Sequence, residues 1–198
     1  MASEPAVSEN LAPEEIAEAE NARFAIVLLL VAELMFFGAL VGMYIVLRFS
    51  AENWKPPLFA ETALGIPLVN TGVLVLSGFF MLLGSRAVRR EGRLGLVCWL
   101  CLTLLCGAVF AAVQYLEFSR LLEEGLALNN IFGTVFYTMA GLHALHVAGG
   151  VLLLSYVSCR AIGGKYRPGR RIGVDLALYY WLMVVLVWIF FFVILYIL

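Results

Sequence analysis

Long apolar stretches separated by short polar connections dominate this chain. Spanning a hydrocarbon core of about 30 Å takes roughly 20 predominantly apolar residues in a helix. Stretches of that kind run near residues 24–47, 66–85, 94–118, 131–160 and 174–198. The pattern therefore predicts an all-α, polytopic membrane protein built as a bundle of five transmembrane helices.

Composition supports the same class of protein. Hydrophobic residues make up 63% of the 198 residues and charged residues only 14%, whereas an average soluble domain carries roughly 25% charged residues. The mean hydropathy is +0.97. We therefore expect an integral membrane chain, and we expect no nucleic acid among its partners.

The basic residues are distributed unequally between the two sides of such a bundle. With five spans the connections alternate between the sides, and the positive-inside rule places the more basic side in the cytoplasm. The less basic side holds Arg48, Lys55 and Arg120. The side that includes the N-terminus holds Arg23, Arg86, Arg89, Arg90, Arg93, Arg160, Lys165, Arg167, Arg170 and Arg171. This bias predicts a cytoplasmic N-terminus and a C-terminus on the outside.

An acidic arm at residues 1–23 precedes the predicted membrane domain, which we place at residues 24–198. The first 22 residues hold six Glu and neither Lys nor Arg, so they do not match the basic start of a secretory signal, and no cleavage is expected. Pro13 followed by EEIAEAE favours a helix start at that point. The arm is either a solvated cytoplasmic segment or a docking element for a basic partner.

No motif in the chain indicates catalysis. Cys98 and Cys101 form a CxxC, but the pair lies inside an apolar segment and no second pair completes a four-ligand zinc site, so we interpret both as structural thiols. We find no activated nucleophile, no glycine-rich phosphate loop and no paired carboxylates. The sequence therefore predicts neither catalytic residues nor a metal or cofactor site within this chain.

Glu33 is the clearest polar candidate, because it lies well inside the first apolar stretch. Ionisable residues at membrane depth are rare and are functional candidates by default. Glu33 could serve a proton relay, contact a lipid headgroup, or form a structural hydrogen bond to a neighbouring helix. Small residues close by allow the helix approach that such a bond requires, namely Ala32, Gly38, Ala39 and Gly42.

Two further pairs of polar residues lie in the apolar stretches. Gln114 and Glu117 are one helical turn apart near the outer end of the third stretch, and we expect them to face water or a loop. Asn70 and Thr71 follow Pro67, so we expect them to satisfy backbone groups that the proline frees and, for Asn70, to pack between helices.

His143 and His146 are the only histidines in the chain and lie three positions apart, on one helical face. Three interpretations are open, which are metal or haem ligation, proton transfer, and hydrogen-bonded packing between helices. Packing is favoured, because the chain offers no further histidine ligand. Nearby glycines predict close contact between helices, namely Gly141, Gly149 and Gly150.

Five motifs in order resemble subunit III of the haem-copper terminal oxidases, from about residue 24 to the end. Glu33 stands at the position of the family's intramembrane carboxylate. The motifs are AELMFF (32–37), WKPP (54–57) with PLVNTGVLVLSG (67–78), VQYLEF (113–118), FGTVFYTMAGLHALHVAGG (132–150) and YYWLMVVLVWIFFFVILYI (179–197).

The resemblance implies a subunit of a cytochrome c oxidase that itself carries no haem or copper. Its expected partners are the catalytic subunit I and subunit II, which hold haem and copper in a complex that reduces oxygen to water and pumps protons. Its implied roles are to bind phospholipid, to protect the catalytic subunit against inactivation during turnover, and to favour proton uptake and oxygen access. Five helices match the short bacterial form, which lacks the first two of seven, and imply a location in the bacterial cytoplasmic membrane.

The last motif departs from the family, because Leu182 and Val185 stand where His and Asp are expected. An equivalent subunit of a quinol oxidase or a nitric oxide reductase is therefore an alternative. A small proton-coupled transporter that uses Glu33 is less favoured, because the sequence shows neither inverted repeats nor broken helices in matching positions.

Overall fold

The structure of the chain, a computed structural model, is all-helical in the part that it describes. Five helices are long and apolar enough to cross a membrane, which confirms the predicted fold class. The described residues are 13–51, 54, 64–90, 92–126 and 130–197. The acidic arm up to residue 12 and the KPP of the WKPP motif lie outside them.

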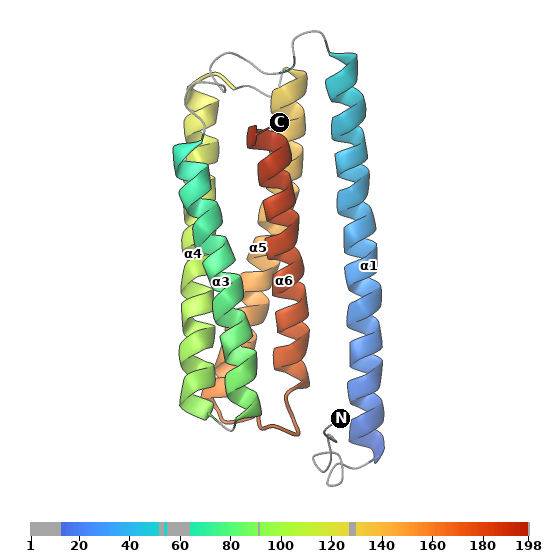
Figure 1. The fold of residues 1–198 in the computed structure, drawn as a ribbon, viewed down its shortest axis with the longest axis vertical. Coiled ribbons are helices and arrows are strands. Elements are labelled where there is room, and N and C mark those ends of the chain that lie inside the picture. Colours follow the sequence, from blue (N-terminus) through green and yellow to red (C-terminus); the bar gives the residue numbers. More distant parts are fainter. Residues whose placement is uncertain (1–12, 52–53, 55–63, 91, 127–129, 198) are drawn as a thin grey trace, which may run out of the picture.

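The first four helices each contain one of the apolar stretches and extend beyond it at one or both ends, and the last helix with its continuation covers the fifth stretch as far as residue 197 (Figure 1). The helices are α1 (Pro13–Ser50), α3 (Gly65–Arg89), α4 (Arg93–Glu123), α5 (Ile131–Ile162) and α6 (Ile172–Phe192), which continues as the short π-helix η2 (Val193–Ile197).

Helices α3, α4, α5 and α6 form a four-helix bundle, in which each helix contacts its two neighbours around the ring. Helix α1 stands outside this bundle and contacts α6 and, less extensively, α5 (Figure 1). The N- and C-terminal ends of the described chain lie at opposite ends of the molecule. With 38 residues, α1 is about 57 Å long at 1.5 Å per residue, so it extends well beyond a 30 Å hydrocarbon core.

The centre of the bundle is filled by Trp181 of α6. Its ring lies in a slot between two glycines, because a Cβ on Gly107 of α4 would come within 2.7 Å of the ring and a Cβ on Gly150 of α5 within 2.8 Å. Its Nε1 donates a 2.9 Å hydrogen bond to Ser77 of α3. One side chain therefore fixes the spacing of all four bundle helices.

A second tryptophan repeats the α6–α3 contact two turns further along. Trp188 Nε1 donates a 2.9 Å hydrogen bond to Thr71 Oγ1, and Thr71 donates in turn to the Pro67 carbonyl at 2.7 Å. The hydroxyl of Thr71 thus bonds to the carbonyl of the proline itself, whereas the carbonyl that the proline leaves without an N–H partner, at position 63, lies outside the described residues. It also fixes the register between α3 and α6.

The other glycines of the GLHALHVAGG stretch differ from the sequence expectation. Nothing lies within 4 Å of the position of a Cβ on Gly141, so this glycine does not mediate a helix contact. A Cβ on Gly149 would meet only the Tyr180 hydroxyl, at 3.5 Å. Close packing in this stretch therefore rests on Gly150, because only that position faces the Trp181 ring.

Helix α1 is attached along a single narrow seam. Among its described side chains the buried ones are Phe37 and Tyr44, which are 4% and 3% exposed and lie seven residues apart on one face. Phe37 packs edge-on against the ring of Phe191 of α6, and Tyr44 donates a 2.8 Å hydrogen bond to the Ile194 carbonyl of η2. In an apolar 18-residue stretch of α1, 6% of the residues are buried inside the structure, compared with 61% in the corresponding stretch of the last span.

Candidate functional site

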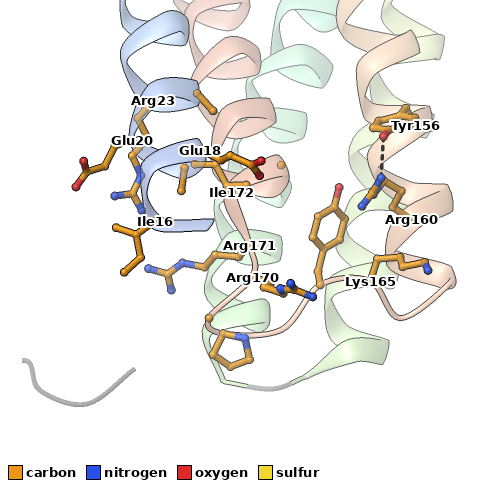
Figure 2. A pocket seen from close by; sticks show the side chains of 16 residues that line it. Ile16, Glu18, Glu20, Arg23, Tyr156, Arg160, Lys165, Arg170, Arg171 and Ile172 are labelled. Atoms are coloured by element: carbon orange, nitrogen blue, oxygen red, sulfur yellow. Dashed lines mark hydrogen bonds between the residues drawn. The ribbon is translucent and has the colours of Figure 1, made fainter. Parts of the chain in front are cut away.

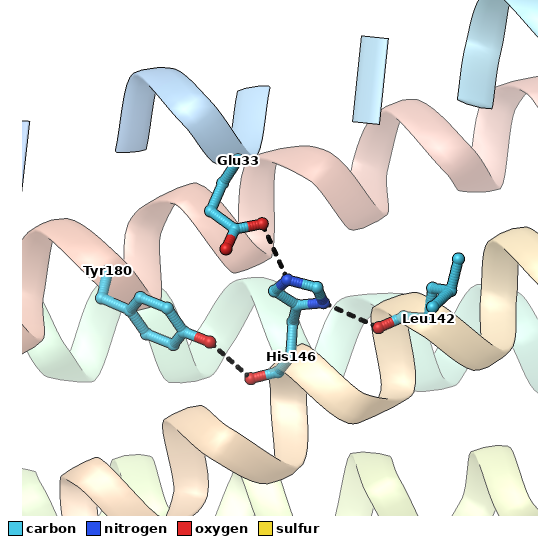
Figure 3. A network of polar contacts seen from close by, with 4 residues as sticks. All are labelled: Glu33, Leu142, His146 and Tyr180. Atoms are coloured by element: carbon cyan, nitrogen blue, oxygen red, sulfur yellow. Dashed lines mark hydrogen bonds and ion pairs between the residues drawn. The ribbon is translucent and has the colours of Figure 1, made fainter. Parts of the chain in front are cut away.

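Glu33 of α1 and His146 of α5 form a polar contact between side chains at the seam of α1 with the bundle (Figure 3). The His146 Nε2 lies 2.8 Å from Glu33 Oε2, and its Nδ1 lies 2.7 Å from the Leu142 carbonyl one turn earlier on α5. Tyr180 of α6 donates a 3.0 Å hydrogen bond to the carbonyl of His146. The contact therefore joins α1 and α5 and is held in place from α6.

The geometry fixes the number of protons in the Glu33–His146 pair. A carbonyl oxygen only accepts hydrogen bonds, so the Nδ1 of His146 carries a proton. The Nε2–Oε2 hydrogen bond then needs one more proton, carried either by the imidazole or by the carboxyl group. In both cases the pair is neutral overall, which is the arrangement that a membrane interior tolerates. The pair can hold one proton and tie α1 to α5.

His143 has different surroundings although it lies one turn away on the same helix. Its side chain is fully buried, and neither ring nitrogen has a hydrogen-bond partner. Its ring stacks on Trp188 with 5.0 Å between centroids and is enclosed by Phe37, Phe110 and Phe191. The expectation that both imidazoles form hydrogen bonds between helices is therefore wrong for His143, whose ring contacts four aromatic side chains and no hydrogen-bonding group.

The two histidines do not converge on one point, because His146 faces α1 and His143 faces the aromatic interior. In the described part of the chain, no group of three or more His, Cys, Asp or Glu side chains could hold a metal ion. Cys98 and Cys101 are free thiols on the outer surface of α4. They do not pack inside the bundle, because their helical face points outward.

Gln114 and Glu117 lie inside the bundle and not in water or a loop, so that expectation is wrong. Their side chains are 3% and 4% exposed. The reason is that α4 continues to Glu123, five residues beyond the expected end at 118, and its inner face remains covered there. Asn70 is also buried, and its Nδ2 donates a 3.2 Å hydrogen bond to the Phe110 carbonyl of α4.

A cationic pocket of 920 Å³ lies between the first turns of α1 and the connection from α5 to α6 (Figure 2). Tyr156 accepts a 2.9 Å hydrogen bond from Arg160 at its edge. Burial raises the pKa of the Tyr166 phenol in its wall, so that group stays neutral. Its charged lining consists of Arg23, Arg160, Lys165, Arg170 and Arg171 with Glu18 and Glu20.

Sequence reasoning missed this pocket and one buried carboxylate. The basic residues of the pocket were evident in the sequence, but they predicted only the orientation of the chain in the membrane. That they come together at the first turns of α1 depends on the fold. Asp175, in the first turn of α6, is 5% exposed, and its Oδ2 lies 3.3 Å from the Nε of Arg171. An acidic residue at the start of an apolar span was the available signal.

Leu182 and Val185 lie against α3. A Cβ on Gly78 would meet the side chain of Val185 at 3.4 Å and that of Leu182 at 3.7 Å. The α3–α6 contact is therefore apolar at these two positions. Close approach at Gly78 compensates there for the absence of polar side chains.

Comparison with known proteins gives a consistent result. Residues 11–198 match the family model described as "Cytochrome c oxidase subunit III". The chain is 38% identical over 170 residues to the cytochrome c oxidase subunit 3 of Thermostichus vulcanus, covering 85% of this chain and 83% of that protein. It is 38% identical over 176 residues to the protein of the same name from Synechocystis sp. (strain ATCC 27184 / PCC 6803 / Kazusa), covering 88% of this chain and 75% of the relative.

Proposed function

Because the chain belongs to the cytochrome c oxidase subunit III family, we propose that it is a non-catalytic support for the catalytic subunit of a haem-copper oxidase. In this proposal subunits I and II hold the haem and copper, reduce oxygen and pump protons. This chain stabilises subunit I in the membrane and binds phospholipid. The electron donor is cytochrome c, as the names of its relatives suggest.

The observation that carries the proposal is the attachment of α1. This helix exposes most of its apolar surface, yet it is joined to the bundle by a neutral polar pair, Glu33 and His146. A hydrogen bond between helices in a membrane contributes about 0.6 to 1.7 kcal/mol. The pair is thus sufficient to hold α1 in one orientation while leaving its outer face available for partner subunits and lipid.

The cationic pocket supports phospholipid binding. Arg and Lys side chains bind phosphate oxygens through charge-assisted hydrogen bonds, and several of them converge at one end of α1. Apolar side chains of α1 beyond this pocket are exposed, including Phe24, Val27 and Leu28. We propose that the pocket holds the headgroup of an anionic phospholipid whose acyl chains lie along α1.

The orientation belongs to the same proposal. The connections at the end of the bundle that holds the pocket carry most of the Arg and Lys residues, which favours the cytoplasmic side. The N-terminus would then lie in the cytoplasm and the C-terminus outside. Since the relatives are bacterial, the membrane would be the bacterial cytoplasmic membrane.

Affinity purification of the full chain from its native membranes tests the function. We expect it to bring down a haem-bearing catalytic subunit, identified by mass spectrometry and by its absorption spectrum. A copper-binding subunit II in the same preparation supports the cytochrome c oxidase assignment over a quinol oxidase. Purification of the chain without any oxidase subunit, or a haem spectrum from the chain alone, would contradict the proposal.

Lipid retention tests the pocket separately. Replacing Arg23 and Lys165 by Ala removes two cations of the pocket, and we expect less anionic phospholipid per complex by native mass spectrometry. The matched control replaces Arg89, the last residue of α3, and Arg90, which follows it, because neither basic residue lines the pocket. Equal lipid loss in both double variants would refute a specific headgroup site.

A further inference from the structure

A polar cluster at the far end of the bundle from the cationic pocket has no role in the function proposed above. On α4, Gln114 and Glu117 are one turn apart on the inner face, and both are at least nine-tenths buried. Phe110 and Leu121 occupy the same buried face before and after them. A carboxylate and an amide therefore lie on a buried face that is otherwise apolar, where leaving a polar group unpaired lowers stability.

The charge of Glu117 is only partly compensated. Its Oε1 lies 3.4 Å from Arg120 Nη2, and the Nε of the same guanidinium lies 3.3 Å from Glu124. Both distances exceed the roughly 2.7–2.9 Å of a charge-assisted hydrogen bond. Accordingly, Glu117 Oε1 has no hydrogen-bond partner, and neither do the Nε and Nη2 of Arg120. One cation is shared by two carboxylates without hydrogen bonding either.

Tyrosines from two other elements lie near this carboxylate. The ring of Tyr137 on α5 packs against Phe118, the neighbour of Glu117, at 5.6 Å between centroids. Tyr196 of η2 is buried and 5% exposed.

The unpaired atoms specify what the cluster can bind. Glu117 Oε1 accepts, whereas the Tyr137 hydroxyl and the Nε and Nη2 of Arg120 donate, and none of these atoms has a hydrogen-bond partner. A cation would be repelled by the N–H and O–H donors of the cluster, and an anion would be repelled by the carboxylate. A neutral molecule that both donates and accepts hydrogen bonds satisfies both kinds of atom. Water does so, since a buried water typically makes two to four hydrogen bonds.

We propose that ordered water is bound between α4 and α5, donating to Glu117 and accepting from Tyr137. The water completes the contact that Arg120 leaves open and links α4 to α5. This inference does not depend on which oxidase subunits accompany the chain.

High-resolution electron cryomicroscopy of the purified complex in lipid nanodiscs tests the site. We expect density for water about 3 Å from Glu117 Oε1, within reach of the Tyr137 hydroxyl. Direct hydrogen bonding of Arg120 to Glu117 with no density between the helices would overturn the inference. Density that belongs to a lipid or to a side chain of a neighbouring subunit would also overturn it.

Substitutions of Glu117 and of its neighbours test whether the water binds to Glu117. Glu117→Leu should abolish the density, and Glu124→Leu, which removes the exposed carboxylate on the same arginine, should leave it. The same density in Glu117→Leu, or its loss in Glu124→Leu as well, would overturn the assignment. If Glu117→Leu does not assemble, Glu117→Gln should keep the water and Tyr137→Phe should displace it, and water that is unchanged in Tyr137→Phe would contradict the site.

Discussion

The centre of the bundle and the seam along α1 hold helices together by different means. At the centre, Trp181 fills a slot formed by Gly107 and Gly150 and donates a hydrogen bond to Ser77. At the seam, α1 relies on Phe37, Tyr44 and the polar pair of Glu33 with His146. The centre is held together by complementary shape, whereas the seam is held together by hydrogen bonds and a few ring contacts.

The contrast has a physical reason. Lipid chains are as apolar as leucine, so burial of apolar surface does not drive helices together inside a membrane. Close packing and hydrogen bonds remain, and close packing requires small residues facing a large one. Helix α1 carries Gly38 and Gly42, but nothing lies within 4 Å of a Cβ at either position. Within the chain, α1 therefore depends on its polar contacts more than the bundle helices do.

The largest effect is expected at the centre. Gly150→Ala places a methyl group 2.8 Å from the Trp181 ring, and overpacking of this kind typically destabilises by about 1–3 kcal/mol. The temperature at which this subunit is released from the purified complex should fall clearly. Gly141→Ala is the matched control, because its Cβ meets nothing within 4 Å. Equal effects of the two substitutions would mean that the slot does not determine packing.

Glu33→Leu should have the next largest effect. It leaves the Nε2 of His146 without a partner, which costs about 1–3 kcal/mol when a group is buried and less at its partial exposure. We expect faster inactivation during turnover with unchanged haem content, measured by oxygen consumption and absorption spectra. Glu33→Gln is the control, because its amide can still donate to Nε2. Identical inactivation rates of Glu33→Leu and the parent would reduce Glu33 to a packing residue.

Tyr180→Phe should have a smaller effect on the same seam. The substitution removes the hydrogen bond to the His146 carbonyl and keeps the ring, and such a bond contributes about 0.6 kcal/mol in a membrane. The release temperature should fall slightly, by less than in Glu33→Leu. A loss as large as that of Gly150→Ala would show that Tyr180 belongs to the packed centre and not to the seam.

His143→Phe should have the smallest effect, although His143 is the more deeply buried histidine. Its nitrogens make no hydrogen bond, so an apolar ring in the same aromatic enclosure breaks no polar contact, and removal of two unpaired polar atoms offsets part of the cost of its larger size. His146→Phe provides the contrast, because it breaks the contact with Glu33. The temperature of subunit release is compared between the two variants. A larger fall for His143→Phe than for His146→Phe would contradict this expectation.

The five spans were predictable because a membrane imposes length and hydropathy on each helix separately. The resemblance also identified the family from motif order alone. The contacts between residues of different helices were harder to predict from the sequence. Glu33 was expected to find a donor on a neighbouring helix, but its sequence neighbourhood does not indicate which donor, since Glu33 and His146 are 113 positions apart.

The errors have a common origin, because each required knowing which helix covers which face. Gln114 and Glu117 were expected near water, since the apolar run ends there, but α4 continues and its inner face is buried. Gly141 and Gly150 look equivalent in the sequence, and only the position of Trp181 separates them. The cationic pocket combines residues from both ends of the sequence, so no local pattern contains it.

We infer that Glu33 and His146 act as one unit that ties α1 to the bundle. A double-mutant cycle in the purified complex tests this coupling, with Glu33→Leu, His146→Leu and the double variant compared by the temperature of subunit release. Residues that share one interaction are non-additive, so we expect the double variant to be released no earlier than the less stable single variant. Effects that simply add would contradict the claim, because they would show that each side chain contributes to stability without the other.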